Sequence, residues 1–113
     1  VDNNKLSGSL PFRPGGNPNL IILNAASNNI EGSIIPAVYL ENLRTLNLRE
    51  NSMMGKFPEE LCLNSLLKSI LVSGNQLIGT IPKCIGEMVQ MEILELSDNH
   101  FQGTIPSSIG TNL

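Results

Sequence analysis

An eight-residue phrase recurs along this chain at nearly constant spacing, and no other feature constrains the fold as strongly. The copy NQLIGTIP begins at Asn75, and NHFQGTIP begins 24 residues later at Asn99. Related phrases begin at Asn4, Asn28 and Asn51, so five copies stand in register. Each phrase has Asn, an apolar residue two positions later, then Gly, and finally an apolar residue before Pro. A fixed period of this size indicates a solenoid of stacked units.

The residues upstream of each repeated Asn follow a second pattern. In the clearest copy, apolar residues precede Asn51 at offsets of eleven, eight, five and three positions: Leu40, Leu43, Leu46 and Leu48. The last two slots alternate with a period of two, which is typical of a short half-buried strand, whereas the spacing of three suits a 3₁₀ stretch. We therefore expect strands centred on residues 22–26, 45–49, 69–73 and 93–97.

The two patterns together resemble a known repeat. The stretches LENLRTLNLRENSMMGKFP (40–58) and MVQMEILELSDNHFQGTIP (88–106) match the unit LxxLxxLxLxxNxLxGxIP of the plant-specific extracellular leucine-rich repeat. The resemblance covers essentially the whole chain and is weakest at 11–19. It implies an α/β-type solenoid of about four to five repeats, with a parallel sheet on the concave side and 3₁₀ or irregular segments on the convex side.

The ends of the chain and one irregular stretch bear on its organisation. Both ends fall inside a repeat, so we expect residues 1–113 to be a single segment from the interior of a longer solenoid, without capping units. The stretch PFRPGGNPNL (11–20) replaces an apolar turn with prolines and glycines. We interpret it as an irregular convex loop of a degenerate unit, since such loops vary freely.

The repeated residues suit structural tasks. An amide side chain both donates and accepts hydrogen bonds, so stacked asparagines can satisfy backbone groups where each coil leaves its strand. We expect an inward-facing ladder formed by Asn4, Asn28, Asn51, Asn75 and Asn99. The proline that closes each phrase is expected to end a short second strand, because proline donates no ladder hydrogen bond.

Charge and composition argue against several functions. The net charge of −3 is small and dispersed, so it favours neither nucleic acid nor an acidic membrane surface. His100 is the only histidine and follows Asn99 at a variable position, where we expect a solvated turn. Neither a Ser–His–Asp set nor metal-ligand spacing is present in the sequence. We therefore expect no enzyme activity, no metal and no cofactor.

The two cysteines leave two interpretations open. Cys62 and Cys84 lie in successive units and are either two buried thiols or a disulfide between adjacent coils. The strings EELCLNSL and IPKCIG resemble a cysteine pair found in plant cell-surface leucine-rich-repeat receptors, which implies the disulfide. Coil stacking would allow it, because it places the two Cα atoms about 6 Å apart.

The resemblance implies a recognition function. The leading hypothesis is a segment of the ectodomain of a plant receptor-like protein or receptor-like kinase in defence or development. Its partner would be a protein or peptide ligand, either endogenous or pathogen-derived, together with a co-receptor. The segment would lie on the extracellular side of the plasma membrane or in the cell wall, and only other parts of the protein would meet the membrane.

Two alternatives accompany this hypothesis. One is a secreted inhibitor of a cell-wall-degrading enzyme, similar to the polygalacturonase-inhibiting proteins. The other is an ice-binding surface, which requires regular rows of small polar residues. The expected strand face mixes Arg49, Glu50, Leu71 and Glu95, so that second alternative is weak.

The residues between the inward leucines are the candidates for ligand contact. They escape the packing that fixes the repeat, and they alternate onto the outer face of each strand. We expect contact to centre on Asn47, Arg49, Leu71, Ser73, Glu95 and Ser97. Arg49 is the strongest candidate, because its rigid fork can pair with a carboxylate. The alternative is that Arg49 only forms a local surface ion pair with Glu50.

Overall fold

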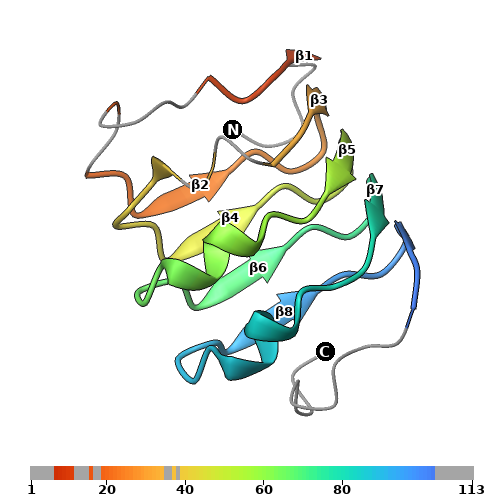
Figure 1. Ribbon diagram of the computed structural model, residues 1–113. Helices are drawn as coiled ribbons and strands as arrows, with labels where there is room; N and C mark the ends of the chain where they lie inside the picture. Colours follow the sequence, from red (N-terminus) through yellow and green to blue (C-terminus); the bar gives the residue numbers. More distant parts are fainter. Residues whose placement is uncertain (1–6, 12–15, 17–18, 35–36, 38, 104–113) are drawn as a thin grey trace.

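The computed structural model describes residues 7–11, 16, 19–34, 37 and 39–103 as a stack of similar coils (Figure 1). Each coil contributes one short strand to a four-stranded parallel sheet with the order β2-β4-β6-β8. These strands are β2 (Ile22–Asn24), β4 (Thr45–Asn47), β6 (Ser69–Leu71) and β8 (Ile93–Glu95). Neighbouring coils pair in register, so Leu46, Ile70 and Leu94 lie opposite one another. The repeat period therefore becomes the spacing of the sheet.

A second parallel sheet forms where each coil turns away from the first. Its order is β1-β3-β5-β7-β9, and Figure 1 shows it stacked beside the four-stranded sheet. The strands are β1 (Ser7–Gly8), β3 (Asn29–Gly32), β5 (Ser52–Lys56), β7 (Gln76–Gly79) and β9 (His100–Phe101). Strand β5 ends before Pro58 and β7 before Pro82, which confirms the expected second strand that ends ahead of the proline.

Short 3₁₀ helices follow two of the prolines. Helix η2 (Glu59–Leu63) begins after Pro58, and η3 (Lys83–Glu87) begins after Pro82. Glu59 and Glu60 lie in the first turn of η2, where carboxylates suit the positive end of the helix. The two helices contact one another and return the chain toward the next strand of the first sheet.

The core is an aliphatic ladder, as the upstream pattern predicted. Leu43, Leu46 and Leu48 are fully buried, and so are Leu67, Ile70 and Val72 at the same positions of the next unit. In the following unit Met88 and Leu94 are buried, whereas Met91 and Leu96 are partly buried against the core. Because each coil repeats the same inward slots, the apolar side chains stack on one another from unit to unit.

The four main strands are shorter than predicted. All four begin at the expected residue but end two residues early, for example at Asn47 instead of residue 49. Beyond each strand the chain runs into a left-handed bend just before the ladder asparagine, with a φ of 60° at Ser27, 55° at Glu50, 73° at Gly74 and 55° at Asp98. Pairing between coils continues into this bend, since Glu50 N–H donates to Ser73 O at 3.0 Å.

The asparagine ladder is confirmed for the described positions, while Asn4 lies outside the described residues. The amide of Asn75 donates to Leu48 O of the preceding coil and to Val72 O of its own coil, at 2.9 and 3.0 Å. Its Oδ1 accepts a hydrogen bond from Met53 N–H at 2.9 Å. Asn51 and Asn99 repeat this arrangement with Ala25 and Ile30, and with Val72 and Leu77. Asn28 donates to the carbonyls of Ala25 and Ala26.

A second amide contact lies on the convex side. Asn64 occupies a slot that holds Leu40 in the preceding unit and Met88 in the next, and its side chain donates to Leu40 O and Leu43 O of the preceding coil at 3.2 and 3.1 Å. Its Oδ1 accepts from Leu66 N–H at 2.9 Å. The departure from the apolar pattern therefore has a structural reason.

The cysteines form a disulfide between adjacent coils. Cys62 of η2 and Cys84 of η3 are bonded, with their Cα atoms 6.0 Å apart. This decides between the two interpretations and agrees with the spacing expected from coil stacking. Within the part of the chain that the structure describes, no helix is long and apolar enough to cross a membrane.

Candidate ligand-recognition surface

The outward side of the four-stranded sheet carries the candidate residues. We call this side the concave face. It consists of the outward-facing residues of β2, β4, β6 and β8, together with those among the two residues that follow each strand. Ser97 is exposed, whereas Leu71 and Ser73 are half-buried. The side chains of Arg49 and Glu95 are 42% and 39% exposed. Solvent therefore reaches five of the six predicted contact residues.

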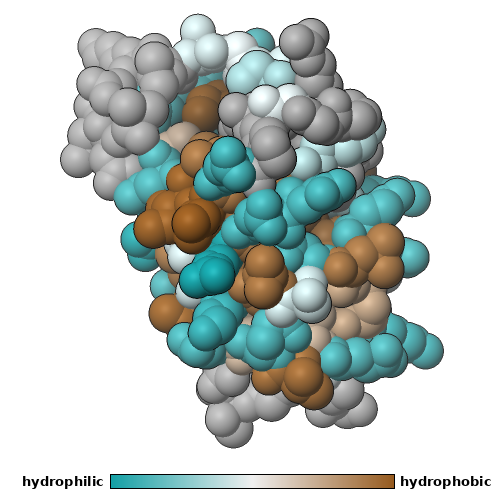
Figure 2. Space-filling view, turned by 90° about the vertical axis from the view of Figure 1, so that its left-hand side faces the viewer, coloured by the Kyte–Doolittle hydropathy of each residue, from teal (hydrophilic) through white to brown (hydrophobic). Residues whose placement is uncertain are grey.

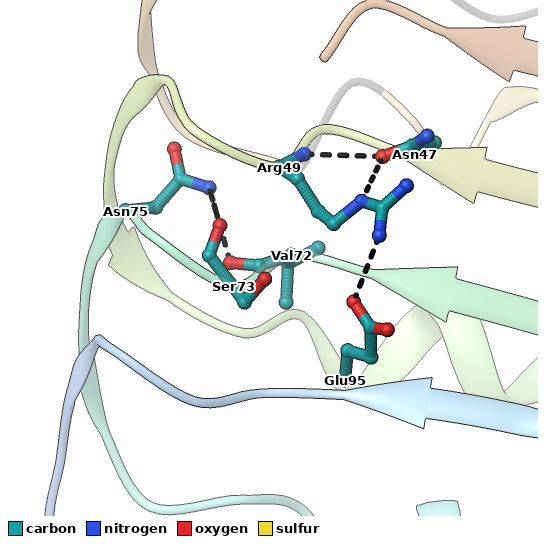
Figure 3. Close-up of polar contacts among 6 residues, drawn as sticks. All are labelled: Asn47, Arg49, Val72, Ser73, Asn75 and Glu95. Carbon is teal, nitrogen blue, oxygen red and sulfur yellow. Dashed lines mark hydrogen bonds and ion pairs between the residues drawn. The ribbon is translucent and has the colours of Figure 1, made fainter. Parts of the chain in front are cut away.

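Arg49 reaches across the sheet to Glu95. Its Nη1 lies 3.5 Å from Glu95 Oε2, and the two residues belong to units separated by the β6 unit (Figure 3). The backbone N–H and Nε of Arg49 both donate to Asn47 Oδ1, each at 3.3 Å. The guanidinium is thus fixed near its base by Asn47 and meets a carboxylate at its far end.

The alternative pairing of Arg49 with Glu50 is not formed among the described residues, because Arg49 pairs with Glu95. Glu50 adopts the left-handed bend, and its carboxylate stands over Gly74, in the space that a Cβ at that position would occupy. Arg49 instead points along the face and meets Glu95. Because of the bend, the side chains of the neighbours Arg49 and Glu50 point in different directions. The stacking of coils instead brings Arg49 close to Glu95, which is distant in sequence.

Asn47 lies in the predicted row with Leu71 and Glu95, but solvent does not reach it. Asn47 is 6% exposed, because its amide oxygen lies against the backbone and side chain of Arg49. Ala26, two residues after β2, is buried as well. Asn47 therefore serves as a positioning residue for Arg49, and a ligand would meet it only through that arginine.

Apolar side chains flank the charged pair on the same sheet. Ile22 at the start of β2 is 59% exposed, and Ile93 at the start of β8 is 46% exposed. The corresponding positions of β4 and β6 hold Thr45 and Ser69, which are half-buried. The concave face therefore combines an ion pair, small hydroxyl groups and two exposed aliphatic groups.

The second sheet presents a different surface. Met54 and Ile78 are about half exposed on β5 and β7, beside Lys56. A groove at their edge is lined by Lys56, Phe57, Pro58, Ile78 and Pro82, among others. His100 at the start of β9 is exposed, as expected for a solvated position.

The flank formed by the turns that enter β4, β6 and β8 is of mixed polarity. Leu66 and Val89 are exposed there, and Lys68 pairs with Glu92 at 3.8 Å. Figure 2 shows apolar groups on this flank separated by hydrophilic ones. Among the described residues no group of histidine, cysteine, aspartate and glutamate side chains is arranged to hold a metal ion.

Comparison with known families agrees with the repeat pattern. The Leucine Rich Repeat profile matches residues 42–64, 66–88 and 90–112, which is more than half of the chain. The chain belongs to the leucine-rich repeat family. Among curated relatives, it is 40% identical over 94 residues to Receptor-like protein 35 of Arabidopsis thaliana, which covers 82% of this chain and 10% of that protein. Such relatives are much longer, since this repeat segment spans about a tenth of their length.

Solved structures of leucine-rich-repeat ectodomains share the fold over the whole segment. The ectodomain of the Arabidopsis receptor kinase GASSHO1/SCHENGEN3, in complex with CASPARIAN STRIP INTEGRITY FACTOR 2, matches with a TM-score of 0.90 and 35% identity. The match covers 100% of this chain and 14% of that one. The Arabidopsis receptor kinase HAESA, in complex with the peptide hormone IDA and the co-receptor SERK1, matches with a TM-score of 0.90 and 34% identity, covering 100% and 19%. The segment is therefore similar to plant receptor ectodomains in both sequence and fold.

Proposed function

We propose that this chain is an interior segment of the ectodomain of a plant receptor-like protein or receptor-like kinase. In this proposal its concave face recognises a protein or peptide ligand outside the cell. The supporting observation is the contrast between the two sides of the four-stranded sheet. The inward side is uniformly aliphatic, whereas the outward side carries Arg49, Leu71, Glu95 and Ser97 in units of the same repeat. Side chains of different chemistry on a regularly repeated backbone suit specific recognition of a ligand.

The rigidity of that lattice supports binding. Each strand is paired with its neighbours, and the turns after the strands are fixed by the asparagine ladder. A preorganised surface loses little conformational entropy when a partner docks, so fewer contacts are needed for a given affinity. Exposed groups on this sheet are better suited to binding than equally exposed groups on an irregular loop.

The disulfide supports a location outside the cytosol. Disulfides persist in oxidising compartments and are rare where glutathione keeps thiols reduced. The bridge between Cys62 and Cys84 fits the extracellular side of the plasma membrane or the cell wall. It also fits the receptor-like relatives, whose names imply a cell-surface setting.

The kind of partner follows from the neighbouring structures. HAESA is seen with a peptide hormone and a co-receptor, and PEPR1 is seen with AtPEP1. By analogy, we infer a peptide or protein ligand for this segment, with a co-receptor as a second partner. The ligand is either endogenous or pathogen-derived. The comparisons favour a receptor over a secreted inhibitor, because the named relatives are receptor-like proteins.

Alanine substitution in the full-length parent protein tests the proposal. Arg49, Leu71, Ser73, Glu95 and Ser97 are replaced one at a time, and binding to fractionated extracellular fluid is measured. We expect loss of the bound fraction from several of these variants. Met54→Ala on the second sheet and Val89→Ala on the turn flank are matched controls, since both are exposed apolar residues away from the concave face. Unchanged binding for all five, with losses in the controls, would assign recognition to another face.

A further inference from the structure

The Arg49–Glu95 ion pair is built so that one end is fixed and the other is open to exchange. Its length of 3.5 Å exceeds the roughly 2.7–2.9 Å of a strong charge-assisted hydrogen bond. Both side chains are about 40% exposed, so solvent screens their attraction. Such exposed pairs contribute little to stability. A ligand that supplies charges of its own can therefore replace this contact at little cost.

Arg49 keeps its position when that contact opens. Its Nε and backbone N–H remain bonded to Asn47 Oδ1, and Asn47 is buried beneath it. A guanidinium carries five N–H donors, of which one meets Asn47 and one meets Glu95. Within the described part of the chain the other three have no protein partner. Arg49 therefore presents an oriented donor edge to a carboxylate that approaches over β6.

The strands that lead to the two charged residues are separated by β6, although the charged groups themselves meet at 3.5 Å. Asn47, Leu71 and Glu95 are aligned by strand register, so Glu95 lies two strands from the residue that positions Arg49. Two strand spacings amount to about 10 Å, with Leu71 between them. In an extended ligand, side chains two residues apart lie on the same face at about 7 Å. Long charged side chains at such positions can reach both Arg49 and Glu95.

We propose that the concave face selects an extended ligand segment carrying one acidic and one basic side chain on the same face, two residues apart. The acid pairs with Arg49 and the base pairs with Glu95. The stretch of the ligand between these two side chains covers Leu71. This inference rests on the proposed function and specifies the ligand class of the same surface.

The Arg49–Glu95 pair would discriminate between ligands according to the signs of their charges. A segment with two acids pairs with Arg49 but places its second carboxylate against Glu95. A segment with two bases pairs with Glu95 but repels Arg49. Uncharged segments bury the existing long ion pair without improving it. Like charges brought together at an interface are strongly unfavourable, so the opposed pair selects against ligands whose charges are all of one sign.

A random peptide library displayed on phage provides the test. It is selected on the full-length parent protein and counter-selected on the same protein carrying Leu71→Arg. The counter-selection retains only peptides that depend on the concave face. We expect the retained peptides to be enriched at least several-fold in acid–base pairs two positions apart. Arg49→Ala should weaken their binding about tenfold, which corresponds to about 1.4 kcal/mol.

The double charge exchange Arg49→Glu with Glu95→Arg is the decisive variant. It conserves net charge, and selection on it should enrich the same spacing with the order of acid and base reversed. Two results would overturn the inference while leaving the concave face as the binding surface. One is that the retained peptides show no enrichment of acid–base pairs two positions apart, and the other is that the order of acid and base stays the same on the exchanged variant. A selection in which every bound peptide survives on the Leu71→Arg protein would overturn both the inference and the proposed function.

Discussion

We expect each asparagine of the ladder to stabilise the fold, and the loss of stability on replacing one follows from the hydrogen bonds that it makes. Replacing Asn75 with alanine removes three donated hydrogen bonds and one accepted bond from a side chain that is 6% exposed. The carbonyls keep other partners, because Leu48 O also accepts from Asn51, Val72 O from Asn99, and Ser73 O from Glu50 N–H. Met53 N–H has no such substitute among the described residues. The variant therefore leaves one buried donor unsatisfied.

An unsatisfied buried donor costs about 1–3 kcal/mol, and the lost donated bonds contribute roughly another 1 kcal/mol in total. We expect Asn75→Ala to lower the free energy of unfolding by about 2–4 kcal/mol. The assay is urea unfolding followed by circular dichroism, on the chain extended by polar capping repeats that cover its open ends. Gln76→Ala, at the exposed neighbouring position, is the control and should change stability by less than about 0.5 kcal/mol. A loss of under 1 kcal/mol at Asn75 would refute the ladder as a stabilising element.

Three further predictions follow from the bends and the disulfide. Replacing both Cys62 and Cys84 with serine should lower stability by about 2–4 kcal/mol in the same assay, and an unchanged urea midpoint would contradict a bridged native state. Gly74→Ala should destabilise by about 1–2 kcal/mol, because the residue is left-handed and its Cβ would displace the Glu50 carboxylate. Ser27→Gly should stabilise by about 0.5–1 kcal/mol, since it relieves a left-handed serine that is exposed; a lower melting temperature would count against that account.

The inward half of the structure was predictable because one rule repeats. Buried slots such as Leu43, Leu46 and Leu48 recur at the same offset from each asparagine, and a misplaced polar residue there would be costly in every coil. Asn64 shows the limit of the rule. It breaks the apolar pattern, yet its amide donates hydrogen bonds to two carbonyls of the preceding coil. No local sequence signal distinguishes this role from a polar residue that merely departs from the repeat.

The strand ends were not predictable for a related reason. The bend that follows each strand is left-handed, but its residue is Ser27, Glu50, Gly74 or Asp98 in successive units. Only Gly74 carries the usual signal for that conformation. The bend is imposed by the coil and the ladder asparagine that follows it, so the residue type at the bend is free to vary.

The candidate surface was predictable in outline but not in its pairing. Alternation along the strands correctly placed Arg49, Glu95 and Ser97 on the solvent side. It could not show that Arg49 meets a carboxylate 46 residues away in preference to its neighbour in sequence. In a stacked sheet, long side chains reach across coils, so contacts on this face depend on which residues share a row.

The most direct test of the account compares covalent capture from three surfaces of the parent protein. A photo-crosslinking side chain is placed at Ser97 on the concave face, at Met54 on the second sheet, or at Val89 on the turn flank, all of which are exposed. Plant cells displaying each version are irradiated in extracellular fluid, and the adducts are identified by mass spectrometry. The account predicts a peptide or protein adduct from Ser97 that is absent from Met54 and Val89. Adducts from Met54 or Val89 with none from Ser97 would contradict recognition by the concave face.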